Sequence, residues 1–516
     1  MSSSQIGGIF TIITNSGFQD KIIMAMEKLN NRLKDEASAN YMANRNLFPN
    51  LSESEFFDKK ELWFPTAASI ETTHILFVNA TFKPFVSIAH EYSKTMPRGS
   101  KAVLGQTFNF TMPVIGQFVS DAVMHIRLEG LSAIHADNKV RYIEMLGHRI
   151  MKKISFKLNE IELDTYTADR YNIHWQYKVP LNKENGYLQS IGQELPKLGY
   201  LTADPTVDSV REYRYFGNGA QTFKRTQSTI DMWIPLLFWF KDIHNALPNS
   251  LFPYGQTNVE IQLESEGNLV GYANYASSTG QIYTPPTVTA CELYMNHIFM
   301  DNAIYLIFIA NLNRSGFQLI RINRTHTQRL TNAEDSILLN QIKWPVECMY
   351  VAFRPVANLG YSDRWHRNTA ITSNLYPSAV VTGGTSLEIN SAQFYDEVPI
   401  VESLGLRIHD IDIYKPMPPS FYNSYIPYQY GYNIKTPRDI GWMMMNFNIY
   451  PGEQQPSGHI NTSLGREFYL NYVSAIDPNT SLPYVRKTNP VDLIIVADCI
   501  NFLMIQDNSA ILNFST

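Results

Sequence analysis

Hydrophobic and polar residues alternate with a period of two along much of this chain. Phe108 and Phe110, for example, stand between Thr107, Asn109 and Thr111. Such alternation is typical of a strand with one buried and one solvated face. Six segments share the pattern: 107–112, 124–129, 154–159, 259–264, 404–408 and 445–449. The chain is therefore predicted to contain half-buried strands in both of its halves.

Two segments depart from this period. The run 492–504 is almost continuously apolar, which predicts a strand that is buried on both faces. At 20–34, apolar residues recur every three or four positions, which predicts one amphipathic helix. That helix has two open interpretations: it packs on its own domain, or it docks on a neighbouring protein or a membrane surface.

Residues that favour turns divide the chain into many short strands. Pro, Gly, Ser and Asn are frequent at 267–286, 361–386 and 414–428, which we interpret as long loops. Many short strands with little helix favour an all-β fold of antiparallel sandwiches, of which the eight-stranded jelly roll is one common form. The length of 516 residues exceeds one ordinary core and predicts two domains.

Composition narrows the possible functions. Lys and Arg number 42 against 47 Asp and Glu, with a net charge of −5 and no basic block, so direct nucleic acid binding is not expected. Cys291, Cys348 and Cys499 lie far apart in no metal-binding spacing, which fits a reducing compartment. Neither a signal peptide nor a transmembrane helix is expected from the apolar runs.

The sequence contains no familiar catalytic or cofactor motif. The residues 217–219 read Gly-Asn-Gly and are interpreted as a turn. Trp365-His366-Arg367 lacks a second histidine nearby and is interpreted as a surface or interface element. The carboxylates of segment 160–164 are placed on a solvated strand face. We predict no catalytic, cofactor or metal site, and a protein that is not an enzyme.

Three segments of the chain resemble a known family. They are 233–240 with the following 245–248, then 292–301, and then 455–463. The signature residues that carry the resemblance are Trp233, Pro235, Phe238, Trp239, Phe240, Pro248, Tyr294, Pro456, Ser457, Gly458, Asn461 and Ser463. Together they resemble the major capsid proteins of nucleocytoplasmic large DNA viruses. A particular resemblance to the asfarvirus-like members rests on further segments, 319–321 with 325–328, 343–347, 424–427, and 509–512 with 515–516. One departure is Leu464, where many members carry a basic residue.

The resemblance, which extends from about residue 63 to the end, implies a fold and its limits. It implies a double jelly roll, meaning two eight-stranded antiparallel β-sandwiches in tandem, with a short N-terminal helical arm. The expected parts are an arm at 1–60, a first jelly roll at 61–300, a connection at 301–316 and a second jelly roll at 317–516.

The resemblance also implies a structural function. Homotrimers would form pseudo-hexameric capsomers that tile the icosahedral shell of a large double-stranded DNA virus. The expected partners are other copies of the chain, minor capsid and penton proteins, and the inner viral membrane near the N-terminus. The expected location is the virion capsid, assembled in a viral factory of the host cytoplasm. A carbohydrate-binding or carbohydrate-active β-sandwich is the alternative function.

Aromatic residues are dense in one part of the second half. They are Phe421, Tyr422, Tyr425, Tyr428, Tyr430 and Tyr432. Two interpretations stay open: these rings contribute large contacts at a subunit interface, or they cover the strand ends of their own domain.

Overall fold

The structure of this protein is a computed structural model. It describes residues 88–99, 101–195, 197–201, 212–216, 219–274, 279–375, 393–464, 467–506 and 509–514. The predicted arm, its helix at 20–34 and the first residues of the turn at 217–219 lie outside these residues. Of the described residues, 88–91, 115–117 and 297–311 belong to one compact unit and all the others to a second.

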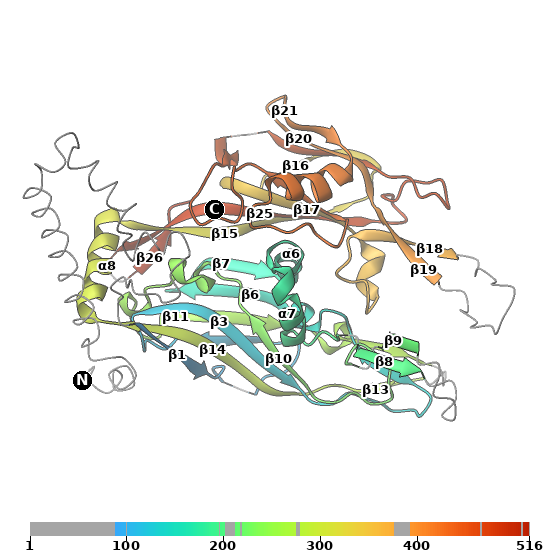
Figure 1. Ribbon diagram of the computed structural model, residues 1–516, viewed down its shortest axis with the longest axis horizontal. Helices are drawn as coiled ribbons and strands as arrows, with labels where there is room; N and C mark the ends of the chain where they lie inside the picture. Colours follow the sequence, from blue (N-terminus) through green and yellow to red (C-terminus); the bar gives the residue numbers. More distant parts are fainter. Residues whose placement is uncertain are drawn as a thin grey trace, which may run out of the picture. The chain divides into compact units, whose positions relative to one another are not determined.

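The first sandwich consists of two four-stranded antiparallel sheets (Figure 1). One sheet has the order β1 (Ile88–Thr95), β14 (Val288–Met300), β3 (Phe118–Leu128) and β10 (Ile230–Pro235). The other has the order β2 (Thr107–Thr111), β11 (Thr257–Leu263), β6 (Met151–Leu158) and β7 (Ile161–Thr167). Three two-stranded pairs extend from it: β4 (Ser132–Ala133) with β13 (Tyr283–Thr284), β5 (Lys139–Tyr142) with β12 (Val270–Ala273), and β8 (Lys197–Leu201) with β9 (Glu212–Phe216).

The second sandwich repeats this strand order. One sheet has the path β15 (Phe317–Leu330), β25 (Val491–Gln506), β17 (Pro345–Pro355) and β22 (Trp442–Asn446), with β23 (Ile460–Asn461) added to β17 and β26 (Ser509–Leu512) to β25. The other has the order β16 (Glu334–Leu338), β24 (Phe468–Ser474), β20 (Val401–Ile408) and β21 (Ile411–Met417). Strands β18 (Thr369–Leu375) and β19 (Gln393–Pro399) form a separate pair. Each sandwich has the strand order of a jelly roll.

Short helices connect the strands. After β7 come α6 (Ala168–Ile173), the π-helix η2 (His174–Lys178), the 3-10 helix η3 (Leu181–Lys183) and α7 (Glu184–Ser190), and α5 (Leu146–Ile150) precedes β6. After β21 come the π-helix η9 (Phe421–Tyr425) and α9 (Ile426–Tyr430). Helix α8 (Asn302–Ser315) stands between β14 and β15. The remaining 3-10 turns are η4 (Trp239–Lys241), η5 (Ile243–Asn245), η6 (Asn249–Leu251), η7 (Glu266–Asn268), η8 (Val356–Gly360) and η10 (Thr462–Leu464). Among the described helices, none has the length and apolar character to cross a bilayer.

The core follows the predicted alternation. In β3, Met124, Ile126 and Leu128 are fully buried, while the residues between them are more exposed. The run 492–504 is confirmed as a strand that is buried on both faces. Its residues Leu493 and Ile495 join the main hydrophobic core, whereas Ile494 and Val496 join a second cluster on the opposite side of the sheet.

The predicted strand at 445–449 is wrong in its position. Strand β22 ends at Asn446, and Ile449 is exposed. The reason is a local turn: the Asn446 amide donates to the Asn448 carbonyl at 2.7 Å, and the Asn448 N–H donates back to the Asn446 side-chain oxygen at 3.3 Å. Side-chain amides that bind nearby backbone end strands in this way.

Asp164 is not on a solvated face, contrary to the sequence interpretation. The register of β6 and β7 shifts by an irregularity between Phe156 and Lys157, so Phe156 opposes Asp164 while Lys157 opposes Glu162. A β-bulge changes which side chains face inward. Asp164 is therefore buried, and Arg170 donates two hydrogen bonds to it at 3.2 and 3.3 Å.

All three predicted loops contain regular structure. The segment 361–386 includes β18, 267–286 includes β12 and β13, and 414–428 includes the end of β21, η9 and most of α9. The loop interpretation of 414–428 is wrong because packing outweighs turn propensity there. Tyr422 is fully buried and fixes η9 on the sandwich. The three cysteines are buried, and no disulfide joins them.

Candidate functional site

The segment Trp233–Phe240 places side chains on both sides of its sheet. Phe238, Trp239 and Phe240 are buried, and their ring centroids lie 5.6, 5.2 and 5.2 Å from that of Phe156 in β6. Pro235 is the last residue of β10, where a missing N–H does little damage to the sheet. The aromatic residues therefore belong to the core of the first sandwich.

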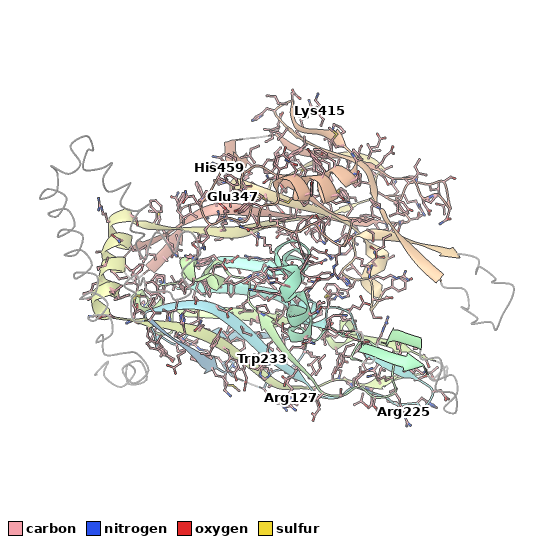
Figure 2. The ribbon with its side chains drawn as sticks, in the orientation of Figure 1. Arg127, Arg225, Trp233, Glu347, Lys415 and His459 are labelled. Carbon is pink, nitrogen blue, oxygen red and sulfur yellow. The ribbon has the colours of Figure 1, made fainter. Side chains whose placement is uncertain are left out.

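Trp233 points away from that core. Its side chain is 43% exposed, and its ring stacks on His125 of β3 with centroids 4.2 Å apart. Tyr294 of β14 lies 5.1 Å from the Trp233 ring. Figure 2 shows Trp233 and Arg127 on the side of the first sandwich that faces away from the second. This is an exposed aromatic surface on a rigid sheet.

Charged groups fix the position of His125 beneath Trp233. One ring nitrogen lies 3.1 Å from Glu292 and the other 2.5 Å from Asp231. Lys94 donates to Glu292 at 3.0 Å. Burial disfavours the charged form of Glu292, but hydrogen bonds from Lys94, His125 and Tyr294 outweigh it and lower the pKa of this carboxyl. The surface is thus both aromatic and electrostatically ordered.

Pro248 lies in a turn that ties the first sandwich together. Leu247 exchanges backbone hydrogen bonds with Val119 at 2.9 Å, and Asn249 donates to the Pro113 carbonyl at 2.9 Å. Between them, Pro248 accepts from the Leu251 N–H at 3.1 Å. Pro248 therefore helps to set the direction of the chain, since proline pre-sets a turn conformation.

The end of the segment 456–463 forms hydrogen bonds with the start of β17 and the residues just before it. Ile460 and Asn461 pair with Val346 and Pro345, and the Thr462 hydroxyl donates to the Trp344 carbonyl at 2.9 Å. The side-chain oxygen of Asn461 accepts a hydrogen bond from the Ser463 N–H at 3.0 Å, and the Ser463 hydroxyl donates to the Lys343 carbonyl.

The Pro-Ser-Gly portion of this segment closes a turn over the end of β22. Ser457 accepts from the Tyr450 N–H at 2.8 Å, and Pro456 is partly buried beside it. Gly458 has φ +145°, and a Cβ there would stand 3.2 Å from the Phe447 carbonyl oxygen. The angle favours glycine, and the space leaves little room for a side chain.

The six aromatic residues of the region 421–432 differ in their environments. Tyr422 is fully buried and donates to the Leu404 carbonyl at 2.8 Å, so it covers its own sandwich. Phe421 stacks on Tyr425 at 5.5 Å. By contrast, Tyr428 is 81% exposed, and Tyr430 and Tyr432 are exposed as well.

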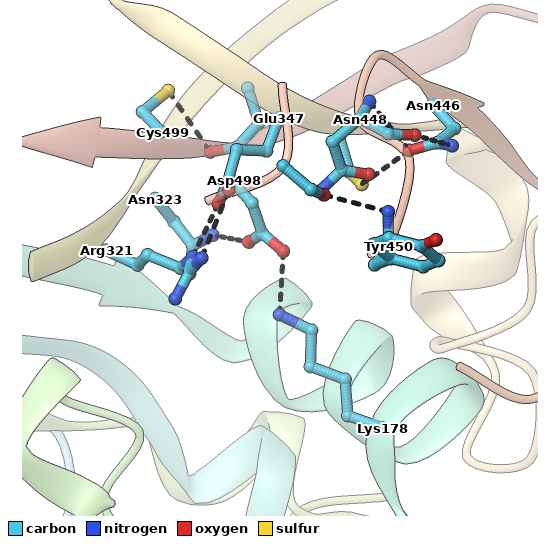
Figure 3. A network of polar contacts seen from close by, with 12 residues as sticks. Lys178, Arg321, Asn323, Glu347, Asn446, Asn448, Tyr450, Asp498 and Cys499 are labelled. Atoms are coloured by element: carbon cyan, nitrogen blue, oxygen red, sulfur yellow. Dashed lines mark hydrogen bonds and ion pairs between the residues drawn. The ribbon is translucent and has the colours of Figure 1, made fainter. Parts of the chain in front are cut away.

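The two sandwiches meet at a polar network (Figure 3). Lys178 at the end of η2 donates to Asp498 of β25 at 2.7 Å, and Asn323 donates to the other oxygen of the same carboxylate. Burial disfavours charge on Asp498, but the ammonium of Lys178 and further donors outweigh it and lower its pKa. Beside it, Arg321 binds Glu347 through two hydrogen bonds of 2.5 and 3.1 Å.

An apolar contact accompanies this network. Tyr177 of η2 packs on Tyr350 of β17 with ring centroids 4.8 Å apart, and both side chains are fully buried. Ile173 joins them in a cluster with Ile494 and Val496 of β25. Helix residues of the first sandwich thus bury apolar surface on the outer face of a sheet of the second.

Further polar contacts complete the junction. Trp365 donates to the Glu144 carbonyl at 2.6 Å, and Asn172 donates to the His366 carbonyl at 2.7 Å. Burial lowers the pKa of His366 to about 3, so this imidazole is neutral at physiological pH. The motif Trp365-His366-Arg367 therefore lies at an interface within the chain itself.

Two further charge pairs join the sandwiches. Glu184 accepts from Arg438 at 2.8 Å, and Arg354 donates to Asp169 at 2.7 Å. Buried charges are stable when they are paired in this way. These partners cannot be predicted from the sequence, because residues such as Lys178 and Asp498 are 320 positions apart and nothing in either half signals the other.

A cavity of about 300 Å³ lies between the sandwiches near this network. Its lining includes the basic residues Lys178 and Lys241 and the acidic residues Asp242 and Asp498. Burial lowers the pKa of Lys241 to about 8. Within the described part of the chain, no three His, Cys, Asp or Glu residues are arranged to hold a metal ion. The geometry is that of a structural junction.

Comparison with solved structures defines the class. The Faustovirus major capsid protein superposes with a TM-score of 0.72 and 28% sequence identity, over 95% of this chain and 100% of that one. A chain of the PBCV-1 virus capsid gives a TM-score of 0.61 at 17% identity, over 86% and 100%, which supports the fold. The protein is a double jelly roll capsid protein, and the predicted fold class is confirmed.

Comparison of sequences gives the family. Residues 317–511 match the model of the large eukaryotic DNA virus major capsid proteins. The hexon protein p72 of African swine fever virus is 27% identical, over 99% of this chain and 100% of that protein. The chain is therefore similar over nearly its full length to the major capsid proteins of large eukaryotic DNA viruses, and as a major capsid protein it builds the icosahedral shell.

Proposed function

We propose that three copies of the chain form a homotrimer whose six sandwiches make one pseudo-hexameric capsomer. The observation that carries the proposal is the repeated strand order: β1-β14-β3-β10 and β15-β25-β17-β22 correspond strand for strand, as do the two partner sheets. Each chain supplies two similar building blocks. Three chains related by closed symmetry then present six blocks around one axis.

The junction between the sandwiches supports this proposal. A capsomer must present its blocks in a fixed geometry, and a flexible link would not do so. Tyr177 and Tyr350 are fully buried between the blocks, and in the Lys178–Asp498 pair beside them the side chains are 38% and 16% exposed. Such a contact, apolar and paired in charge, makes the two sandwiches one rigid element of a lattice.

We further propose the surroundings of this capsomer. Its partners are neighbouring capsomers, minor capsid and penton proteins, and the inner viral membrane near the N-terminus, without direct nucleic acid binding. Assembly takes place in a viral factory of the host cytoplasm. The proposed parts of the chain are the arm at 1–60, the jelly rolls at 61–300 and 317–516, and the connection at 301–316, a range that includes α8.

We propose a purely structural function without catalysis. Trp233 and the carboxylates near it lie on the outer face of a sheet, and the cavity between the sandwiches is lined by charges that are paired or of both signs. No observation on the described residues favours the carbohydrate alternative over a lattice role. A screen of immobilised glycans against the purified protein would overturn this part of the proposal by a specific, saturable signal.

The mass of the native particle tests the trimer. Multi-angle light scattering on the purified full chain is expected to give three times the 59.0 kDa chain mass at micromolar concentration. A folded particle that stays at one chain mass over that concentration range would overturn the proposal. Thermal unfolding with a cooperative transition shows that the particle measured is folded.

A further inference from the structure

The contact between the two sandwiches leaves two corresponding surfaces outside it. Within the chain, the side of the first sandwich that carries β7, α6 and η2 lies against the sheet of β15, β25 and β17 (Figure 1). Among the described residues, the opposite side of the first sandwich, with β3 and β10, and the β20–β21 side of the second sandwich do not take part. The contact is head-to-tail, so it can be repeated between copies.

Register shows which residues correspond. In the first sandwich, Met124 pairs with Ile234 and His125 with Trp233. In the second, Met349 pairs with Met445 and Tyr350 with Met444. Met124 and Met349 are both fully buried in the core, so their neighbours His125 and Tyr350 point outward from equivalent places. His125, with Trp233 stacked on it, therefore occupies the place at which Tyr350 receives Tyr177.

The helical segments after β7 and β21 correspond too. Each contains a π-helix next to a short α-helix, in the order α6 then η2 after β7 and η9 then α9 after β21, and each has a fully buried tyrosine, Tyr171 in α6 or Tyr422 in η9. Tyr177 lies six residues after Tyr171, and Tyr428 lies six residues after Tyr422. Tyr177 is fully buried against Tyr350, whereas Tyr428, at the same spacing from its buried tyrosine, is 81% exposed.

These two surfaces have the chemistry of an interface. The first, here called the Trp233 face, consists of Tyr92, His125, Arg127, Trp233 and Tyr294. The second, here called the Tyr428 segment, consists of Tyr425, Tyr428 and Tyr430. Exposed tyrosine, tryptophan and arginine are the residues most enriched at the centre of protein interfaces.

We propose that the Trp233 face of one copy receives the Tyr428 segment of the next copy, so that the contact between subunits repeats the contact within a subunit. The inference rests on the proposed trimer and specifies its surfaces. Because the two surfaces differ, each copy offers one of each, and a head-to-tail ring closes when every surface is used. Three copies thereby form three identical contacts.

Single-face variants test this proposal. Tyr428→Arg removes one surface, and Trp233→Asp removes the other; Arg127→Glu is a second variant of the Trp233 face, since its side chain is exposed and its loss does not touch the core. Each is expected to weaken the trimer at least ten-fold in its dissociation constant. The control is Tyr254→Arg, which alters a tyrosine that is 77% exposed and belongs to neither surface.

Mixing the variants gives the sharpest outcome. A Trp233→Asp copy keeps its Tyr428 segment, and a Tyr428→Arg copy keeps its Trp233 face, so one intact contact joins them. Native mass spectrometry of the mixture is therefore expected to show a species of two chains and no trimer, while each variant alone stays at one chain. If both variants form trimers as the Tyr254→Arg control does, the proposed surfaces are wrong and the trimer stands. If the wild-type chain is itself a monomer, the proposed function fails instead.

Discussion

Lys178 of the first sandwich and Asp498 of the second form an ion pair of 2.7 Å, although 320 residues separate them in the sequence. The pair stands beside Tyr177 and Tyr350, whose rings pack at 4.8 Å. The two sandwiches are therefore joined by an apolar contact between rings with an ion pair beside it. The strength of that junction can be measured residue by residue.

Loss of one partner of the ion pair is expected to destabilise the chain. Lys178→Met leaves the Asp498 carboxylate, with 16% exposure, without its ammonium, at a cost of about 1–3 kcal/mol of unfolding free energy. The matched control is Lys153→Met, whose pair with Glu162 is exposed at 46% and 37% and is expected to change stability by less than about 0.5 kcal/mol. Urea unfolding followed by tryptophan fluorescence measures both; equal effects would contradict the account.

Tyr177→Ala is expected to uncouple the two sandwiches. Removing a buried aromatic side chain costs about 3–5 kcal/mol, and here all of that loss falls on the junction. Scanning calorimetry is expected to show one main transition for the wild-type chain and two for the variant. Tyr254→Ala, at a side chain 77% exposed, serves as control and leaves the profile unchanged. A single transition with a lower midpoint in Tyr177→Ala would contradict the role assigned to the junction.

Stability is expected to fall as the pH drops below about 6.5. Burial lowers the pKa of His148 and of His366 to about 3, from 6.5 in the unfolded chain. Between these values the unfolded state binds protons that the native state does not, so each lost pH unit removes about 1.4 kcal/mol per histidine. Denaturant midpoints at pH 7 and pH 5 measure this slope. His148→Gln is expected to reduce it; an unchanged slope in that variant would exclude His148 as a source.

Asp498 responds at lower pH. Its folded pKa lies below the ordinary aspartate value of 3.8, so its contribution is fully present above that value and is lost as the pH falls through the folded pKa. The Asp498→Asn variant is expected to lose stability at neutral pH and to show a flatter decline below about pH 4. A decline as steep as that of the wild-type chain would show that other carboxylates dominate there.

Gly458→Ala is expected to destabilise the turn over β22. The φ of +145° and the Phe447 carbonyl oxygen, 3.2 Å from where an alanine Cβ would stand, predict a loss of about 1–3 kcal/mol. Gly186 in α7 is the control, because a Cβ there meets nothing within 4 Å, and alanine is the better helix former by up to about 1 kcal/mol. Thermal midpoints that move in the same direction for both variants would contradict the role assigned to Gly458.

The sequence predicts the strands well where one face is dry. Met124 and Ile126 are buried as their alternation indicates, and the run 492–504 forms the strand buried on both faces. Asp164 and Ile449 were misplaced, because a bulge and a side-chain turn change the register locally. Single-sequence patterns contain no information on such shifts.

The junction itself was not visible in the sequence. Lys178, Asp498 and Tyr177 carry no local signal, since their environment arises only when two distant segments meet. The resemblance identified Trp233 and Trp239 together as signature residues, yet only the structure separates the exposed ring from the buried one. The family could be inferred from motifs, whereas the surfaces required the folded structure.

In the proposed capsomer, the two rigidly joined sandwiches of each chain act as two of six blocks. Electron microscopy of the purified native particle, averaged in views along its symmetry axis, tests it most directly. The account predicts a particle with three-fold symmetry and a six-lobed, hexagonal outline. A particle with two lobes, or a three-fold particle whose outline is triangular with three lobes, would contradict it.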